Sequence, residues 1–509
     1  MKPRLFETVM LAALLCTAPA TDVPAQNATA GKPGQSVQGG APAGNEVARI
    51  EPAESEPART EPAWSEKAIK QRIDPAEVSG QIAGAALEEL AEKGRDLFEA
   101  RFTVLDGAGR PNATQAIVPT ASRRPAEQPF QRLAGPDANA CSSCHNEPVT
   151  GGAGGFVANA FVSEGFESAE FDTLDAQFSN ERGTNHLFGA GLIELLAREM
   201  SADLAAQRRA ALRQARDEGR EVRAGLASKG VEFGRLTAFP DGSVDLSDLD
   251  GVDDDLVLRP FTQKGVMTSL RQFTVNAMNQ HHGMQADERW GTRWTGTADF
   301  DGDGHAGELG AGEISALVAF QATLAPPREE VPEDAAWAKA ADRGRKMFAE
   351  LGCESCHRPA LPLTSLAFAD PGSFDMAGTL RTGDVAAPAH YDLSTLEWAK
   401  RLPRNEKGEV MVPLFGDLKR HRIADSRTPA LGNETLAQRF VERDVFVTAE
   451  LWGLADTAPY GHRGDMTTLD EVIRAHGAEA EESGRAYAAL AEADRSALIA
   501  FLKTLRVVE

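Results

Sequence analysis

The chain has 509 residues, of which 42% are hydrophobic and 25% charged, and its formal net charge at pH 7 is -23. This length is enough for two or three domains with their own cores, and the composition is that of a soluble globular protein. The strong acidity argues against a nucleic acid as partner and favours a basic protein.

The N-terminus has the pattern of a secretory signal peptide. Lys2 and Arg4 precede an apolar run at residues 9–15, and small alanines follow that run. The run is too short to span a bilayer, and no other segment is apolar enough to do so. We therefore predict a signal peptide over residues 1–20, a disordered Ala-, Pro- and Glu-rich tether over residues 21–77, and a periplasmic mature protein that does not span the membrane.

Four of the five cysteines fall in two C-x-x-C-H motifs. The motifs are Cys141, Cys144 and His145, and Cys353, Cys356 and His357. In such a motif the two thiols add to the vinyl groups of a haem and the histidine binds its iron. We therefore predict two covalently bound haem c groups, with His145 and His357 as proximal ligands. The fifth cysteine, Cys16, would leave with the signal peptide, so no cysteine remains for a disulfide.

Each motif lies between segments that occur twice. Gly-Arg-Asp-Leu-Phe at residues 94–98 recurs as Gly-Arg-Lys-Met-Phe at 344–348, and Ser-Ala-Leu-Val-Ala-Phe at 315–320 recurs as Ser-Ala-Leu-Ile-Ala-Phe at 496–501. An opening helix, a haem motif and a closing helix form the plan of a class I cytochrome c domain. We predict a mainly α fold with two such domains in tandem, over residues 78–326 and 335–509.

The first domain carries large insertions. We predict a long Ala-, Arg- and Glu-rich helix from about residue 191 to 226, followed by an acidic loop at residues 245–255. Trp294 and Trp452 are interpreted as core residues, with electron relay as the alternative.

A third repeat predicts two equivalent helices over the two haems. Gly-Val-Met-Thr-Ser-Leu at residues 265–270 resembles Gly-Asp-Met-Thr-Thr-Leu at 464–469, at an offset of 464 − 265 = 199. Thr268 and Thr467 are the predicted N-caps of these helices, because a threonine side chain can accept a hydrogen bond from a free backbone N–H group.

The sixth ligands of the two haems are predicted to differ. His476, on the second of these helices, is the predicted sixth ligand of the second haem, with a structural histidine as the alternative. Its first-half equivalent is Ala277 (476 − 199 = 277), which cannot bind iron. His281, beside His282, lies one turn further on the same face, so the first haem has either a histidine ligand or an open position with a histidine above it. His462 is a rival ligand or braces a loop. Structural or surface roles are expected for His186, His390 and His421.

An acidic segment precedes the closing helix of the first half. Its carboxylates alternate and a glycine follows them, which is typical of the start of a calcium loop; they are Asp299, Asp301 and Asp303. Position 12 of the loop lacks its usual glutamate, so Glu308 or Glu313 would complete the shell. A solvated acidic turn is the alternative to calcium binding.

With these motifs in place, the chain resembles the bacterial di-haem cytochrome c peroxidase superfamily, and more closely its di-haem oxidoreductase branch. The matching stretches are residues 188–196, 273–284, 299–309 and 451–460, within a likeness that spans roughly residues 85–505. The resemblance implies that one haem collects electrons and the other reduces hydrogen peroxide to water.

The same resemblance bears on the site residues. It places the sixth ligand of the electron-collecting haem after a Pro-Tyr-x-His-x-Gly stretch, here residues 459–464, and His476 stands where the peroxidases have methionine. The catalytic Gln and Glu of the peroxidases fall by spacing near Phe273 and Gly283, so neither is preserved. His281 or His282 is therefore expected to take over the acid–base work.

Three functions follow as hypotheses. The first is a haem-dependent, peroxidase-type oxidoreductase that uses electrons from a small donor, such as a basic cytochrome or a cupredoxin, to reduce hydrogen peroxide or another small substrate. The second is an electron-transfer cytochrome with two six-coordinate haems. The third is a haem oxygenase-type enzyme, because relatives in the superfamily cleave rubber or oxidise protein side chains.

Overall fold

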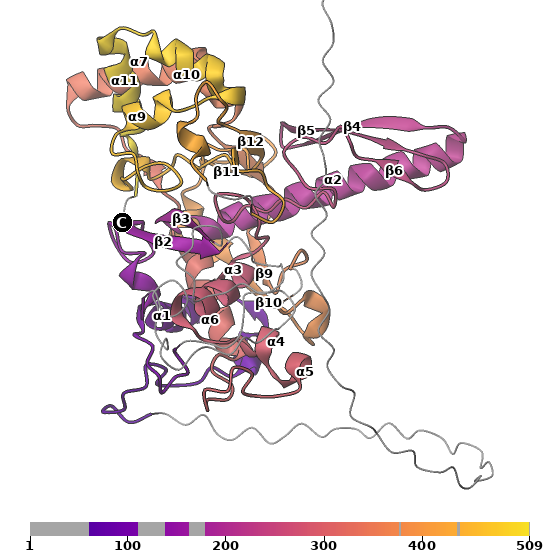
Figure 1. The fold of residues 1–509 in the computed structure, drawn as a ribbon, viewed down its shortest axis with the longest axis vertical. Coiled ribbons are helices and arrows are strands. Elements are labelled where there is room, and N and C mark those ends of the chain that lie inside the picture. Colours follow the sequence, from indigo (N-terminus) through magenta and orange to yellow (C-terminus); the bar gives the residue numbers. More distant parts are fainter. Residues whose placement is uncertain (1–60, 110–137, 162–178, 376–377, 435–437, 508–509) are drawn as a thin grey trace, which may run out of the picture. The chain divides into compact units, whose positions relative to one another are not determined.

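The computed structural model describes residues 61–109, 138–161, 179–375, 378–434 and 438–507. The predicted signal peptide and residues 21–60 of the predicted tether lie outside these ranges. Among the described helices, none combines the length and the apolar character that a membrane span requires. The fold is mixed, with helices dominant and short strands between them (Figure 1).

Two pairs of crossing helices organise the molecule. Helix α1 (Ala85–Glu99) packs against α6 (Ala311–Thr323), and α7 (Ala335–Glu350) packs against α11 (Glu492–Leu502). The helices that the sequence repeat marks as equivalent, α1 with α7 and α6 with α11, thus take the same place in the two pairs. Each opening helix is therefore matched with the closing helix of its own half.

A glycine lies at each crossing and explains how close the helices come. A Cβ atom on Gly94 would lie 1.9 Å from the carbonyl oxygen of Ala316, and one on Gly344 would lie 2.0 Å from that of Ala497. Because a real Cβ cannot approach so closely, only glycine permits this backbone contact. Next to each crossing a phenylalanine pair packs with ring centroids 5.1 Å apart in the first pair and 5.5 Å in the second (Phe98 with Phe320, Phe348 with Phe501).

The hydrophobic cores do not follow the predicted boundary at residues 326–335. The smaller core contains α7, α9 (Leu469–Arg474), α10 (Glu481–Ala488) and α11. Most apolar side chains of residues 361–418 pack instead into the larger core, together with the first half, whereas Phe415 belongs to the smaller core. A three-stranded sheet makes the same connection, with β1 (Gly80–Ile82) parallel to β10 (Ala389–Asp392) and β10 antiparallel to β9 (Ala367–Asp370). The boundary separates the helix pairs but not the cores.

Residues 61–77 are not a disordered tether, so that part of the prediction was wrong. Ile69 and Ile73 are buried in the larger core. The backbone N–H of Ile69 donates to Asp106, and that of Ile73 donates to Glu313 at 2.8 Å. These apolar contacts and long-range hydrogen bonds, which composition cannot reveal, hold the segment in place.

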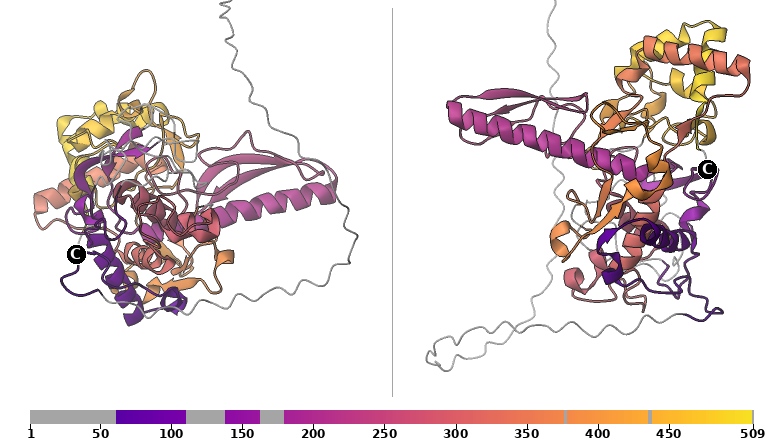
Figure 2. Two further views of the ribbon diagram at one scale, coloured as in Figure 1. Left: turned by 60° about the horizontal axis from the view of Figure 1, so that its bottom comes forward. Right: turned by 180° about the vertical axis from the view of Figure 1, so that it is seen from behind.

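The insertion combines a helix with a sheet (Figure 2). Helix α2 (Ala190–Glu218) ends at Gly219, whose φ of 65° is the left-handed conformation that stops a helix. The chain returns as β4 (Val222–Ser228), β5 (Val231–Ala238) and β6 (Val244–Asp245), an antiparallel sheet whose first two strands pack on α2. The helix predicted to reach residue 226 was thus too long, and the acidic segment predicted as a loop begins in β6.

The third repeat is also structural. Helix α3 (Leu270–Ala277) and helix α9 each follow an antiparallel bridge, Phe261 with Met267 and Tyr460 with Met466. Their N-caps are Ser269 and Thr468, one residue after the predicted Thr268 and Thr467 in both copies. The predicted threonines instead donate their backbone N–H groups to side chains of the first helical turn.

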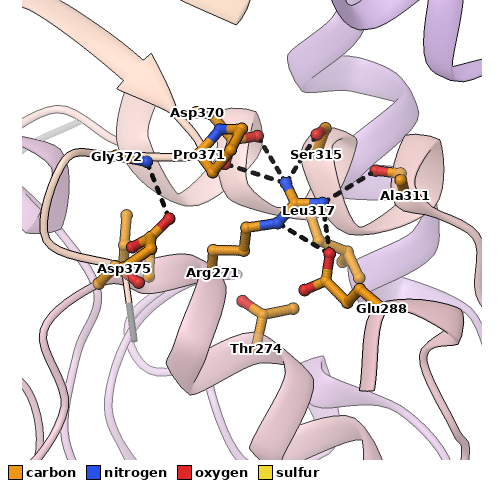
Figure 3. Close-up of polar contacts among 12 residues, drawn as sticks. Arg271, Thr274, Glu288, Ala311, Ser315, Leu317, Asp370, Pro371, Gly372 and Asp375 are labelled. Atoms are coloured by element: carbon orange, nitrogen blue, oxygen red, sulfur yellow. Dashed lines mark hydrogen bonds and ion pairs between the residues drawn. The ribbon is translucent and has the colours of Figure 1, made fainter. Parts of the chain in front are cut away.

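A buried arginine fastens α3 to the rest of the first half (Figure 3). Arg271 is 1% exposed, and its guanidinium donates to Glu288 at 2.6 and 2.9 Å and to Asp370 at 2.9 and 3.0 Å. It also donates to the Ser315 hydroxyl at 2.9 Å. These partners come from α4 (Asp287–Trp290), β9 and α6, so a single side chain joins four elements.

Replacing Arg271 with methionine should destabilise the protein strongly. The change leaves the carboxylates of Glu288 and Asp370 buried without their cation, which costs about 3–5 kcal/mol in the free energy of unfolding. Urea denaturation of the haem-loaded protein measures this loss. The control is Arg293→Met, which removes an exposed ion pair with Asp384 and should cost about 0–1 kcal/mol. Equal losses in the two variants would contradict the structural role of Arg271.

Candidate haem-binding site

Both C-x-x-C-H motifs line a single cavity of about 590 Å³. The cysteines stand on two short 3-10 turns, Cys141–Ser143 and Cys353–Ser355, after the opening helices. Most of the cavity lining is apolar. The cavity volume lies in the range of about 300–1,000 Å³ that is usual for ligand and cofactor pockets. The three candidate distal histidines, His281, His282 and His476, line the same cavity.

The two proximal histidines are oriented by the backbone. The N–H of His145 donates to Cys141 O, and that of His357 donates to Cys353 O, both at 3.0 Å, so each imidazole turns back beside its cysteine pair. The Nδ1 of His145 donates to Asn185 O at 2.9 Å, and that of His357 donates to Phe415 O at 3.2 Å. A hydrogen bond at Nδ1 leaves Nε2 with its lone pair for a metal. Burial lowers the pKa of each imidazole to about 4, which keeps it in the neutral, metal-binding form.

The second motif faces a second imidazole. The ring centroids of His357 and His476 lie 6.3 Å apart, and His476 Nδ1 donates to Val472 O at 2.7 Å. An ion bound between two imidazoles, at metal–nitrogen distances of about 2.0 Å, separates their centroids by about 6.4 Å. The residues at this site therefore fit a haem iron with two histidine ligands. His476 lies just after α9, which ends at Arg474, rather than within the helix.

The first motif has a different distal side. Helix α3 ends at Ala277, the predicted equivalent of His476, and continues as a π-helical turn, Met278–His282, that carries both candidate histidines. His282 is 3% exposed; its Nδ1 donates to Ala138 O at 2.8 Å, and its Nε2 lies 3.4 Å from Cys141 Sγ. His281 lies close enough to His145 to contribute, after burial, to the lowered pKa of that imidazole. Wide π-turns of this kind are frequent at functional sites.

His462 belongs to an ionic cluster in the cavity wall. Its ring stacks on Phe446 at 4.3 Å, and its Nε2 lies 3.2 Å from Glu434 Oε1. The same carboxylate pairs with Arg182 and lies 4.0 Å from the Lys264 ammonium group. Burial, together with the neighbouring Arg182, lowers the pKa of Lys264 to about 7 despite the attraction of Glu434. These contacts agree with the alternative in which His462 braces a loop.

The structure bears on the roles expected for four other residues, and it corrects the core role expected for Trp294. His421 lies in the cavity wall, with its Nδ1 4.0 Å from Cys356 Sγ, and is not an ordinary surface histidine. His186 also lines the cavity, and its Nε2 donates to Trp452 O at 3.1 Å. Trp452 is buried as expected, whereas Trp294 is 48% exposed and lies beneath the guanidinium of Arg293. In the sequence, Asp417 lies four residues before His421 and was the available signal that this histidine has a carboxylate partner.

The predicted cation loop brings its aspartates together. Oxygen atoms of Asp299, Asp301 and Asp303 all lie within 4.8 Å of one another. Glu308 is buried and interacts electrostatically with Asp301, and burial and the charge of Asp301 raise its pKa to about 10. Glu313 is engaged elsewhere, since its carboxylate accepts the N–H groups of Gly310 and Ile73 at 2.9 and 2.8 Å. Of the two glutamates considered for the shell, Glu313 is thus committed to other partners, which leaves Glu308 as the candidate.

Comparison with protein families confirms the resemblance seen in the sequence. Residues 424–505 match the family described as "Di-haem oxidoreductase, putative peroxidase". This segment contains His462 and His476, and the family's name implies two haems, which agrees with the two cysteine pairs.

No curated protein matches the sequence. The solved structures that match this chain include the following two. Hydrazine synthase of Kuenenia stuttgartiensis has 12% identity and a TM-score of 0.37, over 89% of this chain and 100% of that chain. A MauG-like protein associated with microbial copper homeostasis has 16% identity and a TM-score of 0.26, over 52% of this chain and 77% of that chain.

Replacing the cysteines of either motif with serine should remove one of two covalently bound haems. Because serine cannot form the thioether bonds, the pyridine haemochrome spectrum of the denatured protein should give one haem per chain for each double variant. Cys16→Ser, outside both motifs, is the control and should leave two. A double variant that keeps both haems would contradict the assignment of that motif.

Proposed function

We propose that the chain is a periplasmic di-haem c-type oxidoreductase of peroxidase type, starting from the family match over residues 424–505. In this proposal each pair of crossing helices frames one cytochrome c-like domain, and the two domains stand in tandem along the chain. The N-terminal signal pattern supports export to the periplasm, where haem c proteins are assembled.

The observation that carries this proposal is the asymmetry between the two distal sides. His476 lies opposite His357 at a spacing that suits two ligands of one iron. In the first half, Ala277 holds the equivalent position, and the histidines come one turn later. In this proposal the second haem, capped by His476, would collect electrons. The first haem, with an open position, would react with the substrate.

The first site would bring peroxide to a haem, which supplies the electrons and the metal for cleaving the O–O bond. The protein's own contribution is a neutral imidazole on the distal side. His282 is held in one tautomer, because its Nδ1–H donates to Ala138 O, and burial lowers its pKa to about 4. Its Nε2 can therefore accept a proton from peroxide and return it to the departing oxygen, as a general acid–base catalyst does. His281, the neighbour of His145, is the other candidate for this role.

The second site would receive electrons from outside. We propose a small basic cytochrome or a cupredoxin as donor, because the chain carries a net charge of -23 and opposite charges speed association. Trp452 is buried and lines the cavity shared by both motifs, which supports the electron-relay alternative considered for it.

One observation favours a second function. His281 lines the same cavity as His145, so it is also a candidate for the sixth ligand of the first haem. Both haems would then be six-coordinate, and the protein would be an electron-transfer cytochrome. A haem oxygenase-type activity is the further alternative, and formation of a stable complex with dioxygen would indicate it.

We also propose calcium as the ion of the acidic loop. Three aspartates with converging oxygens supply the carboxylate ligands that calcium prefers, and the buried Glu308 is our candidate for a further ligand. The Glu308 carboxylate accepts the N–H of Gln285 at 2.7 Å, three residues after His282. A bound ion would therefore stiffen the segment that follows the distal histidines.

Electron paramagnetic resonance of the purified protein, oxidised and half-reduced, tests the enzymatic proposal. We expect a high-spin ferric signal from the first haem in at least one of these states, and peroxide turnover with a reduced donor. His282→Leu and His281→Leu should each be compared with the wild type. Replacing the histidine that acts as acid–base catalyst should lower the rate with peroxide about 100-fold or more.

His390→Leu, in strand β10, is a control that should leave this rate unchanged. Two low-spin signals in both redox states, with slow reaction toward peroxide, would overturn the peroxidase proposal and leave the electron-transfer cytochrome.

Calcium removal should destabilise the protein more in mildly alkaline than in acidic solution. Without a cation, burial and the neighbouring Asp303 raise the pKa of Asp301 to about 7. A raised folded-state pKa stabilises the fold fully below the ordinary aspartate value, and this contribution is lost as the pH rises through 7. Bound calcium compensates the ionised carboxylates, so the Tm difference between calcium and chelator should grow from about pH 5 to about pH 8.

Asp301→Asn should abolish that difference, whereas Asp425→Asn, on a half-buried turn outside the loop, should retain it. A Tm that is the same with calcium and with chelator at both pH values would show that the loop is only a solvated acidic turn.

A further inference from the structure

His421 lies at the centre of a hydrogen-bonded chain beside the second haem motif. It occupies the middle of strand β12 (Arg420–Arg422), which pairs with β13 (Val445–Val447), and it is 9% exposed. Its Nε2 donates to Asp417 Oδ2 at 2.9 Å and its Nδ1 donates to Glu479 Oε2 at 2.8 Å. Both ring nitrogens thus serve as donors to carboxylates, which only the charged imidazolium can do.

One end of this chain reaches the proximal side of the haem site. Asp417 is 2% exposed, and its other oxygen accepts the N–H of Lys419 at 3.0 Å, which fixes the carboxylate. Two residues earlier in the same turn, Phe415 O accepts the Nδ1–H of His357. The segment that orients the proximal ligand is therefore the one that accepts the hydrogen bond from His421.

The other end reaches the distal side. Glu479 stands three residues after His476, and its second oxygen accepts the N–H of Arg422 at 2.8 Å. The N–H of Gly477, the residue directly after His476, donates to Ile423 O at 2.9 Å. The segment that leaves His476 is therefore tied to β12 at two adjacent points, and the His421–Glu479 pair is the charged one.

We propose that His421 is a positioning residue that clamps the proximal turn to the distal segment and so holds His476 opposite His357. This inference rests on the proposed ligation of the second haem by His476. Movement of the short loop that carries a sixth ligand can take that ligand away from the iron. Here two charge-assisted hydrogen bonds restrain the loop and so keep the ligand in place. Burial disfavours the imidazolium, but the hydrogen bond that His421 donates to the Asp417 carboxylate favours it and, with the contact to Cys356, raises the pKa of His421, so the clamp is charged at neutral pH.

Carbon monoxide binding to the fully reduced protein tests the clamp. The gas can bind the second haem only after His476 has left the iron, so its rate there reports how often the ligand dissociates. In His421→Leu, which keeps the side chain's bulk but removes both hydrogen bonds, carbon monoxide should bind the second haem about tenfold faster than in the wild type. Glu479→Gln should raise the rate in the same direction but by less, because a neutral acceptor remains.

The matched control is Glu481→Gln, which removes a carboxylate two residues away that pairs with Arg427 and not with His421. Its rate should equal that of the wild type. Unchanged rates in both His421→Leu and Glu479→Gln would overturn the clamp. Should His421→Leu fail to fold, Glu479→Gln decides alone, since the Glu479 side chain is 47% exposed and its replacement leaves the core intact.

A further variant separates this inference from the proposal beneath it. His476→Ala should bind a full second equivalent of carbon monoxide rapidly and show a high-spin second haem before the gas is added. If His476→Ala instead matches the wild type, His476 is not the ligand and the proposed ligation fails. If His476→Ala behaves as expected while the His421 and Glu479 variants do not differ from the wild type, only the clamp fails.

Discussion

Arg271 carries a full positive charge inside the protein, and the positions of four elements follow from the need to compensate it. Its partners Glu288 and Asp370 are equally buried, and the Asp370 carboxylate also accepts the hydroxyl of Tyr391 at 2.9 Å. A charge in this environment is tolerated only when its hydrogen-bonding groups are matched, so the helix that bears it has little freedom to slide or rotate. Because α3 leads directly into the π-turn with His281 and His282, the arginine also sets where the distal histidines can be. Asp370 comes from the second half, which makes the first haem site dependent on a strand far along the chain.

The two halves keep one frame and differ where chemistry is expected. Each frame has a glycine at the helix crossing and a phenylalanine pair beside it, and the first phenylalanine of each pair packs 6.0 or 6.4 Å from its proximal histidine. Above this shared base the helices diverge. Helix α9 stops at Arg474 and the chain turns so that His476 approaches His357, whereas α3 widens into a π-turn. A scaffold that occurs twice in the chain, with two different distal segments, gives two candidate cofactor sites that need not have the same function.

Hydrogen bonds that cross between segments repeatedly decide how the site is held. The Glu308 carboxylate reaches from the acidic loop to the backbone after the π-turn, and the Glu434 carboxylate reaches Arg182 in the other half of the chain. In each case a carboxylate is withdrawn from water and must find a donor or a cation. The resulting hydrogen bonds and ion pairs hold loops that have few apolar residues of their own. In these loops polar contacts take the place of a hydrophobic core.

The sequence alone determined the covalent and periodic features of the protein. Cysteine spacing identified both motifs, the repeat identified the helix pairs and the third equivalence, and alternating aspartates identified the loop. Each of these signals lies within a short stretch of chain, so one dimension suffices to see it. The tertiary structure decided what depends on distant partners. It buried Ile69 and Ile73, whose backbone N–H groups donate to Asp106 and Glu313, and it placed most of the apolar side chains of residues 361–414 in the larger core. It also drew His421 between Asp417 and Glu479, the second of which stands 58 residues away. Only folding brings such groups within hydrogen-bonding distance, and no local pattern records which of them will meet.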